Sequence, residues 1–157
     1  MRRSNREITS IEDIKEIINN CSVMRLAVHD AEGIYIVPMN FGYEFEDGVW
    51  TFYFHSANEG RKIDAITKNP TLAFELDCEG ELIEAEKACG YSYRFASVTG
   101  VGTVSFLEGD KKAHGLSILM HHQTGKHFQF SQDGTQKVSV FAVNSTSLTA
   151  KAHRPQQ

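Results

Sequence analysis

The sequence predicts a mainly β protein, a small antiparallel barrel with two or three peripheral helices. Most of its apolar segments are short and either alternate with polar residues or are rich in β-branched and aromatic residues, as strands are. Turn residues such as Asp47-Gly48 separate them, whereas only a few segments place apolar residues at helical spacing. A chain of 157 residues with 41% apolar content suits one domain over residues 1–157.

The first predicted element is a helix. Four isoleucines, beginning with Ile11, recur at helical spacing between residues 11 and 18. Ser10 stands just before them as a candidate N-cap, and Asp13 follows three residues later as a loose capping-box partner. This helix is expected to cover one end of the barrel.

Three strands are predicted in the next part of the chain. Residues 23–29 form the first, and residues 34–45 form a long second strand that is interrupted at Pro38. Proline has no N–H to donate to a ladder, so Pro38 must lie at a sheet edge, at a bulge, or where another group meets the backbone. Asp47-Gly48 is a hairpin signal that joins this strand to the third, residues 49–55.

The second half of the chain is predicted to contain two helices and further strands. A short amphipathic helix near residues 60–68 stops at Asn69-Pro70. A long strand over residues 93–107 is expected to bend around a barrel corner at its glycines. The acidic stretch 78–90 is expected to be an irregular surface excursion. The remaining elements are a strand at 71–77, a helix at 110–121, and closing strands at 138–143 and 147–151.

The segment most indicative of function runs from Trp50 to Lys62. A strongly β-forming run ends in His55-Ser56, and a turn of small residues then leads to Arg61-Lys62 at the start of the short helix. Cations near a helix N-terminus, where the helix dipole also favours an anion, suit a phosphate. The alternative is a solvated basic helix start, since lysine and arginine are mostly exposed.

Composition and charge narrow the class of partner. The net charge is −4 and the basic residues are scattered, which argues against a nucleic-acid or membrane-surface role. The three cysteines show no close paired spacing, which disfavours a disulfide framework and a cysteine zinc site. Since neither a secretory h-region nor an apolar run long enough to span a bilayer is present, a cytoplasmic protein is expected.

Histidines gather in one region of the sequence. His121, His122 and His127 lie near one loop, and His114 precedes them on the same predicted helix. Adjacent helical residues point about 100° apart, and no Asp, Glu or Cys stands at a conventional metal spacing beside them. No metal site is expected, and the histidines are predicted to line a pocket or to face solvent.

Four short motifs follow one another between residues 24 and 125. They are YIVPMNFGY at residues 35–43, YFHSA and GRK within residues 53–62, Asn69-Pro70, and Ser97-Val98 followed by Gly100 and Gly102. In this order and spacing they resemble the FMN-binding split-barrel proteins. Within that group the chain is most similar to the branch related to nitroimidazole-resistance proteins, which are relatives of pyridoxamine 5'-phosphate oxidase.

The resemblance implies a fold and a cofactor site. The fold would be a six-stranded antiparallel split β-barrel of Greek-key topology, dimeric, with FMN in grooves at the interface. Arg61 and Lys62 would hold the phosphate, and Ser97 would belong to a site completed by a second subunit. The flavin ring would lie along one strand and beside the end of the next, near Val37, Pro38, Met39, Asn40, His55 and Ser56.

The implied function is that of an FMN-dependent oxidoreductase of the nitroreductase type. NADH or NADPH would reduce the flavin, which would pass electrons to a small electrophile such as a nitroaromatic or a quinone. His55 would either donate a proton during flavin oxidation or serve only as a ligand. A non-catalytic flavin- or haem-binding module is the alternative, because one fold serves several functions.

The chain departs from pyridoxamine 5'-phosphate oxidases proper. Those enzymes carry a C-terminal segment with a tryptophan and with substrate-binding arginine and histidine. Here the only tryptophan is Trp50, and the tail 151–157 does not reproduce that segment. Oxidation of vitamin B6 is therefore not expected.

The residues themselves also favour a homodimer. The strands at 41–45 and 49–54 are aromatic and apolar. They offer more apolar surface than one small barrel is expected to hide, and a symmetric partner would cover the excess.

Overall fold

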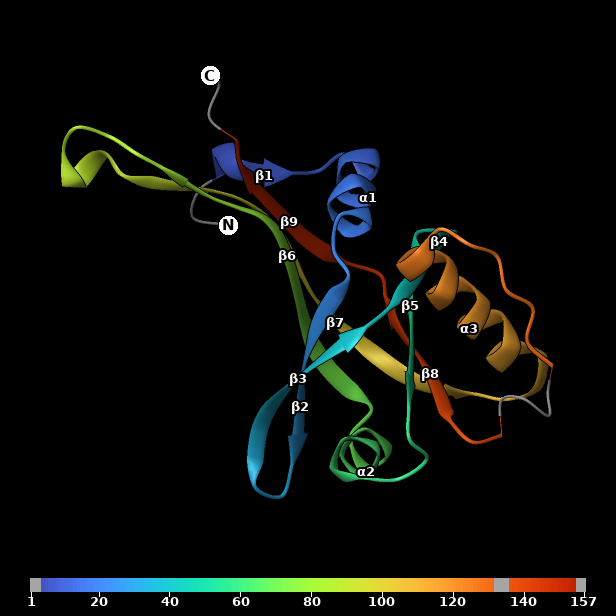
Figure 1. The fold of residues 1–157 in the computed structure, drawn as a ribbon. Helices are drawn as coiled ribbons and strands as arrows, with labels where there is room; N and C mark the ends of the chain where they lie inside the picture. Colours follow the sequence, from blue (N-terminus) through green and yellow to red (C-terminus); the bar gives the residue numbers. More distant parts are fainter. Residues whose placement is uncertain (1–3, 132–135, 155–157) are drawn as a thin grey trace.

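The architecture is mainly β and is described by a computed structural model over residues 4–131 and 136–154 (Figure 1). The prediction of a mainly β fold with peripheral helices is confirmed, although the described residues contain nine strands where six were expected. Two short 3-10 turns, Ser4–Arg6 and Ala88–Gly90, complete the structure. The strands and helices are β1 Glu7–Ile8, α1 Ile11–Asn19, β2 Val23–Asp30, β3 Gly33–Asn40, β4 Gly42–Glu46, β5 Val49–Ser56, α2 Arg61–Lys68, β6 Thr71–Ile83, β7 Ser92–Leu107, α3 Gly109–Thr124, β8 Ser139–Ser145 and β9 Leu148–His153.

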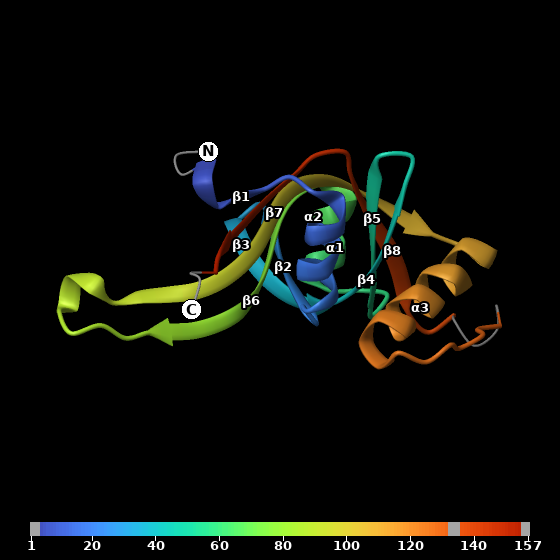
Figure 2. The same ribbon diagram turned by 90° about the horizontal axis from the view of Figure 1, so that it is seen from above.

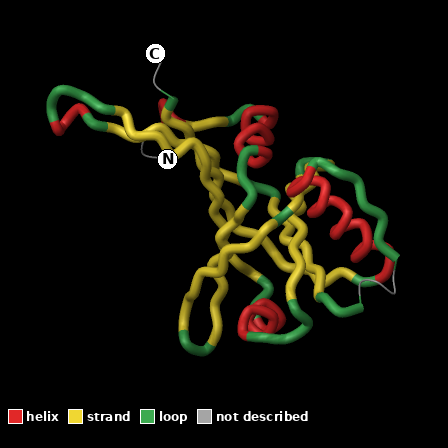
Figure 3. The backbone as a smooth tube through the Cα atoms, in the orientation of Figure 1, coloured by secondary structure: helices red, strands yellow, loops and turns green. Residues whose placement is uncertain are grey.

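The strands form one antiparallel sheet that curls without closing (Figure 3). Its order is β3-β2-β6-β7-β8-β5-β4, and β9 pairs with β7 and with β1. The two end strands, β3 and β4, are consecutive in the chain and are separated only by Phe41. Within residues 4–131 and 136–154 no ladder joins them. The barrel is therefore split at this point, as the resemblance implied.

The corner predicted in the long strand is present. β7 pairs with β9 from Phe95 to Gly100 and with β8 from Thr103 onward. A Cβ atom built on Gly102 would lie 2.5 Å from a methyl carbon of Val143, so only glycine fits there. The strand thus changes partners at its glycines.

The helices cover separate parts of the sheet (Figures 1 and 2). α1 lies against β6 and β7, α2 against β2, and α3 against β4, β5 and β8. The Ser10 hydroxyl accepts a hydrogen bond from the Asp13 amide at 3.4 Å, which confirms the predicted N-cap of α1. Across the described residues no helix is long and apolar enough to cross a membrane.

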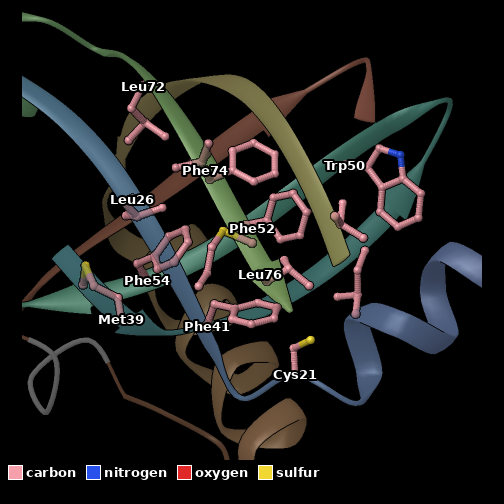
Figure 4. Packing of buried hydrophobic residues seen from close by; sticks show 14 of the residues in the cluster. Cys21, Leu26, Met39, Phe41, Trp50, Phe52, Phe54, Leu72, Phe74 and Leu76 are labelled. Atoms are coloured by element: carbon pink, nitrogen blue, oxygen red, sulfur yellow. The ribbon is translucent and has the colours of Figure 1, made fainter. Parts of the chain in front are cut away.

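Aromatic side chains fill the barrel interior (Figure 4). Phe41, Phe52 and Phe54 have no exposed surface, and Trp50 is 3% exposed. The ring centroids of Phe41 and Phe52 are 6.0 Å apart in an edge contact. One chain therefore buries the largest side chains of the strands that we expected a partner to cover, whereas Tyr43 and Phe45 are only partly buried.

The long strand predicted at 34–45 breaks at Phe41 and not at Pro38. Pro38 pairs with Arg25 across the β2–β3 ladder and lies on β3, an end strand, which is one of the positions predicted for it. The break allows Gly42 to meet α3 closely. A Cβ atom on Gly42 would lie 2.5 Å from the Cα of Leu119 and 2.6 Å from the carbonyl oxygen of Ile118.

Replacing Gly42 with alanine is expected to lower the free energy of unfolding by about 1–3 kcal/mol, the usual cost of overpacking. Both colliding atoms belong to the backbone of α3, so no side chain can rotate away. Gly80→Ala is the control, because its Cβ would meet only the Tyr93 ring at 3.5 Å. Urea unfolding measures both variants, and equal stability of Gly42→Ala and the parent would contradict the close contact.

The stretch 78–90, predicted to be irregular, is half strand. β6 continues to Ile83 in pairing with β7, and its register shifts between Cys78 and Glu81, where Glu79 has a φ of 64°. The paired ends of β6 and β7 leave the body as an arm (Figures 1 and 2). Arg154 holds the base of this arm through two hydrogen bonds of 2.9 Å from its Nε to the Glu79 carboxylate. The acidic composition concealed the strand, because the arm is largely exposed on both faces.

Candidate functional site

The segment from β5 to α2 carries four of the predicted site residues: His55, Ser56, Arg61 and Lys62. His55 is exposed at the end of β5, Ser56 is 7% exposed, and a short loop leads to α2. The N-cap of α2 is Gly60, which has a φ of 125° and supplies no side-chain hydrogen bond. The first N–H groups of a helix have no intrahelical partner, so this terminus offers free donors and a positive dipole end.

Lys62 lies in the first turn of α2 and is partly exposed. Within the described part of the chain its ammonium group pairs with no carboxylate. Its charge is therefore available to a ligand at the helix terminus.

Arg61, the neighbouring cation, is already engaged. Its Nε lies 2.6 Å from Asp30 Oδ2, and its Nη2 lies 3.3 Å from Asp30 Oδ1 and 3.2 Å from a Glu32 oxygen. The guanidinium also stacks over the Tyr35 ring, 4.1 Å from its centroid. The Arg61 hydrogen bond lowers the pKa of the Asp30 carboxyl below its ordinary value. Arg61 thus joins α2 to the β2–β3 hairpin.

The four predicted residues of β3 divide between two faces. Pro38 and Asn40 are exposed, whereas Met39 is 8% exposed and Val37 packs against the core. The Asn40 amide donates to the Ser22 carbonyl oxygen at 2.9 Å. Because β3 ends the sheet, no described strand pairs with its other edge, and backbone N–H and C=O groups there are available to a ligand.

Ser97 lies on β7, three strand intervals from β3, or roughly 14 Å at the usual strand spacing. It pairs with Asp77 on β6 and with Lys151 on β9. Ser97 faces outward, as Pro38 does. One chain therefore does not bring Ser97 next to the predicted residues of β3.

An apolar row crosses the outer face of the sheet between these positions. Ile36 lies opposite Ala27, Ala27 opposite Ala73, and Ala73 opposite Val101. Ile36 and Val101 are 64% and 60% exposed, and Ile34 on the same strand is 74% exposed. Sequence reasoning missed this face because Ile34 to Val37 are all apolar or aromatic, so alternation does not show which side is buried.

The sequence of this chain matches a known protein family over most of its length. The model of the family described as pyridoxamine 5'-phosphate oxidase matches residues 10–152. The chain belongs to this family. None of the curated protein sequences matches it.

Three solved structures share the fold of this chain. A candidate 5-nitroimidazole antibiotic resistance protein from Bacteroides thetaiotaomicron is 33% identical, with a TM-score of 0.80 over 93% of this chain and 86% of that one. The FAD and heme binding protein from Mycobacterium smegmatis is 16% identical, with a TM-score of 0.79 over 97% and 76%. A flavocytochrome from Azotobacter vinelandii is 15% identical, with a TM-score of 0.79 over 99% and 72%. The resemblance to the nitroimidazole-resistance branch is confirmed by the first of these.

The histidines of this family member do not form one cluster. The rings of His121 and His127 stack with centroids 4.3 Å apart, whereas His122 bonds to the Cys21 carbonyl oxygen at 2.8 Å. His114 lies 3.0 Å from both oxygens of Glu44. Among residues 4–131 and 136–154 no group of three or more His, Cys, Asp or Glu is arranged to hold a metal ion.

Acidification is expected to destabilise this family member through His122. Burial lowers the pKa of its imidazole, and nearby His121 acts in the same direction. The unfolded chain, with a pKa of about 6.5, therefore takes up the proton first, and stability falls as pH drops through that value toward the folded pKa. Thermal unfolding at about pH 7 and about pH 5 should show a larger loss in the parent than in His122→Gln, which cannot become charged. Equal losses would contradict the assignment.

Proposed function

We propose that this protein binds FMN in a groove at the interface of a homodimer and acts as a cytoplasmic oxidoreductase. NADH or NADPH serves as the reductant, and the substrate is a small electrophile such as a nitroaromatic or a quinone. The relationship to the candidate 5-nitroimidazole resistance protein supports this substrate class. FMN, when bound, supplies the hydride-accepting and electron-donating chemistry, while the protein binds, orients and protonates.

One observation carries the proposal: the N-terminus of α2 combines free backbone donors with a lysine that has no carboxylate partner in the described part of the chain. Gly60 leaves the terminus uncapped by any side chain, and a Cβ atom built at Gly60 would meet nothing within 4 Å. Lys62 adds a full positive charge in the first turn. This donor set fits a phosphate monoester.

The free edge of β3 suits the polar edge of a flavin ring. The ring's carbonyl and imide groups need a backbone donor and a backbone acceptor, and the unpaired edge of β3 offers groups of both kinds. Tyr35, close to Arg61, and Pro38 are three residues apart, or about 10 Å along a strand. A single ligand can therefore span both the strand and the start of α2.

A second copy of the chain completes the site in this proposal. Ser97 is too far from β3 of its own chain, but it lies on the outer face that carries Ile36 and Val101. An open hollow of about 590 Å³ adjoins Val101 on that face and is lined also by Thr99 and Thr149. Two such faces meeting about a two-fold axis would bury the apolar row and bring the Ser97 side of each chain toward the β3 of the other.

Ile36→Lys is expected to convert the protein to a monomer at micromolar concentration, because it places a charge on the more exposed end of the apolar row. Phe128→Lys is the control, since Phe128 is 40% exposed in the segment after α3, away from that row. Light scattering measures the mass of each. A parent that is itself monomeric, or an Ile36→Lys protein that remains dimeric, would contradict this interface.

Anaerobic reduction tests the proposed activity. The purified protein, titrated with FMN, should show a bound-flavin spectrum that bleaches with NADH or NADPH and returns when a nitroaromatic is added. A flavin that binds but is never reduced by either nucleotide would limit the protein to a binding module. A stable Soret band with no flavin binding would favour the haem alternative.

A further inference from the structure

Arg61 stands at a position that the family pattern associates with phosphate, yet its guanidinium faces two carboxylates. Asp30 and Glu32 contact it at 2.6–3.3 Å and 3.2 Å. These carboxylates come from the tip of the β2–β3 hairpin, about thirty residues away in sequence. The contact is therefore tertiary and not a consequence of helix sequence.

The charges around Arg61 oppose a phosphate there. One guanidinium and two carboxylates carry a net charge of about −1, and a phosphate dianion brought to the same group would face both carboxylates at short range. Lys62, in contrast, has no carboxylate partner among the described residues. The two adjacent cations are thus not equivalent.

The Asp30 side chain is fixed on both sides. It is only 17% exposed, and its Oδ1 accepts a hydrogen bond from the Glu32 amide at 2.9 Å. The Tyr35 ring lies beneath the guanidinium, and the Tyr35 hydroxyl is buried without a hydrogen-bond partner. Arg61 therefore packs against a part of the hairpin in which Asp30 and Tyr35 are already held in place.

We propose that Arg61 is a positioning residue, a strut that fixes the end strand β3 against the N-terminus of α2, and that Lys62 alone of the two contacts the phosphate. The proposal rests on the proposed flavin site and assigns separate tasks to its two cations. α2 carries the phosphate end of the site and β3 carries the ring end, so the spacing between them decides whether one ligand can reach both. The Arg61–Asp30 pair joins α2 to the end of β2, and the stacking of Arg61 on Tyr35 joins α2 to β3 itself.

Hydrogen exchange tests the strut without any flavin. In Arg61→Lys, which keeps the charge but loses the two-pronged contact and the stacking, amides of the β2–β3 hairpin should exchange faster than in the parent. Asp30→Asn should also speed exchange of these amides. The double variant should exchange no faster than either single variant, since each substitution removes the same Arg61–Asp30 interaction. Lys62→Ala is the control and should leave hairpin exchange unchanged.

Titrations with FMN and with riboflavin, which lacks the phosphate, separate the roles of the two cations. Arg61→Lys should weaken binding of both ligands by a similar factor, on the order of tenfold, whereas Lys62→Ala should weaken FMN only. An Arg61→Lys protein with unchanged hairpin exchange that loses affinity for FMN alone would overturn the strut and make Arg61 a phosphate ligand. If the parent binds neither flavin, the proposed function fails, and the exchange experiment still decides whether Arg61 holds the hairpin.

Discussion

Lys62→Ala is expected to weaken FMN binding by about one to two orders of magnitude, the loss of one charge-assisted contact worth roughly 1.5–3 kcal/mol. Lys62 lies in the first turn of α2 beside N–H groups that no side chain caps, and no described carboxylate neutralises it. The effect should therefore fall on the phosphate and not on the ring. Fluorescence titration with FMN and riboflavin measures it.

Lys68→Ala is the matched control for this prediction. Lys68 lies in the last turn of the same helix, where its positive charge interacts with the negative end of the helix dipole, away from the proposed phosphate site. It should bind FMN as the parent does. Equal FMN affinity in the parent and in Lys62→Ala would exclude α2 as the phosphate site.

His55→Ala is expected to slow reoxidation of the reduced flavoprotein by a nitroaromatic by about 10²-fold, the lower range for general acid catalysis. His55 is exposed at the end of β5, next to the loop that leads to α2, and its ring would lie beside a ligand bound in the proposed site. FMN affinity should change little. Stopped-flow reoxidation of fully loaded protein provides the rate.

His55→Gln separates the two roles left open for this histidine. Glutamine keeps a hydrogen-bond donor and acceptor but cannot deliver a proton near neutral pH. If His55 is a proton donor, His55→Gln should be as slow as His55→Ala. If glutamine restores the parent rate, His55 is only a ligand.

Local signals predicted much of the fold. The Asp47-Gly48 turn has the positive φ angles, 50° and 80°, that its sequence indicated, and Ser10 caps α1. The outward arm and the break after β3 were missed for a common reason. Each depends on the surroundings of a strand, which the sequence of that strand does not show. The arm is surrounded largely by solvent, and the strand that follows the break meets α3 at Gly42.

The sequence predicted which residues belong to the candidate site but not which contacts they make in the fold. The run from His55 to Lys62 is continuous in sequence, so its grouping followed from local pattern. The engagement of Arg61 by Asp30 could not be predicted, because it joins residues 31 positions apart through the path of a hairpin. The exposed apolar row also required strand register, which places Ile36, Ala27, Ala73 and Val101 side by side.

Sedimentation velocity of the FMN-loaded protein, followed at the protein band and at the visible flavin band, tests whether a second copy of the chain completes the flavin site. Both signals should sediment together as a dimer with one flavin for each chain, and Ile36→Lys should lose the flavin as it loses the dimer. Flavin that sediments with a stable monomer would contradict a site completed by a second copy of the chain.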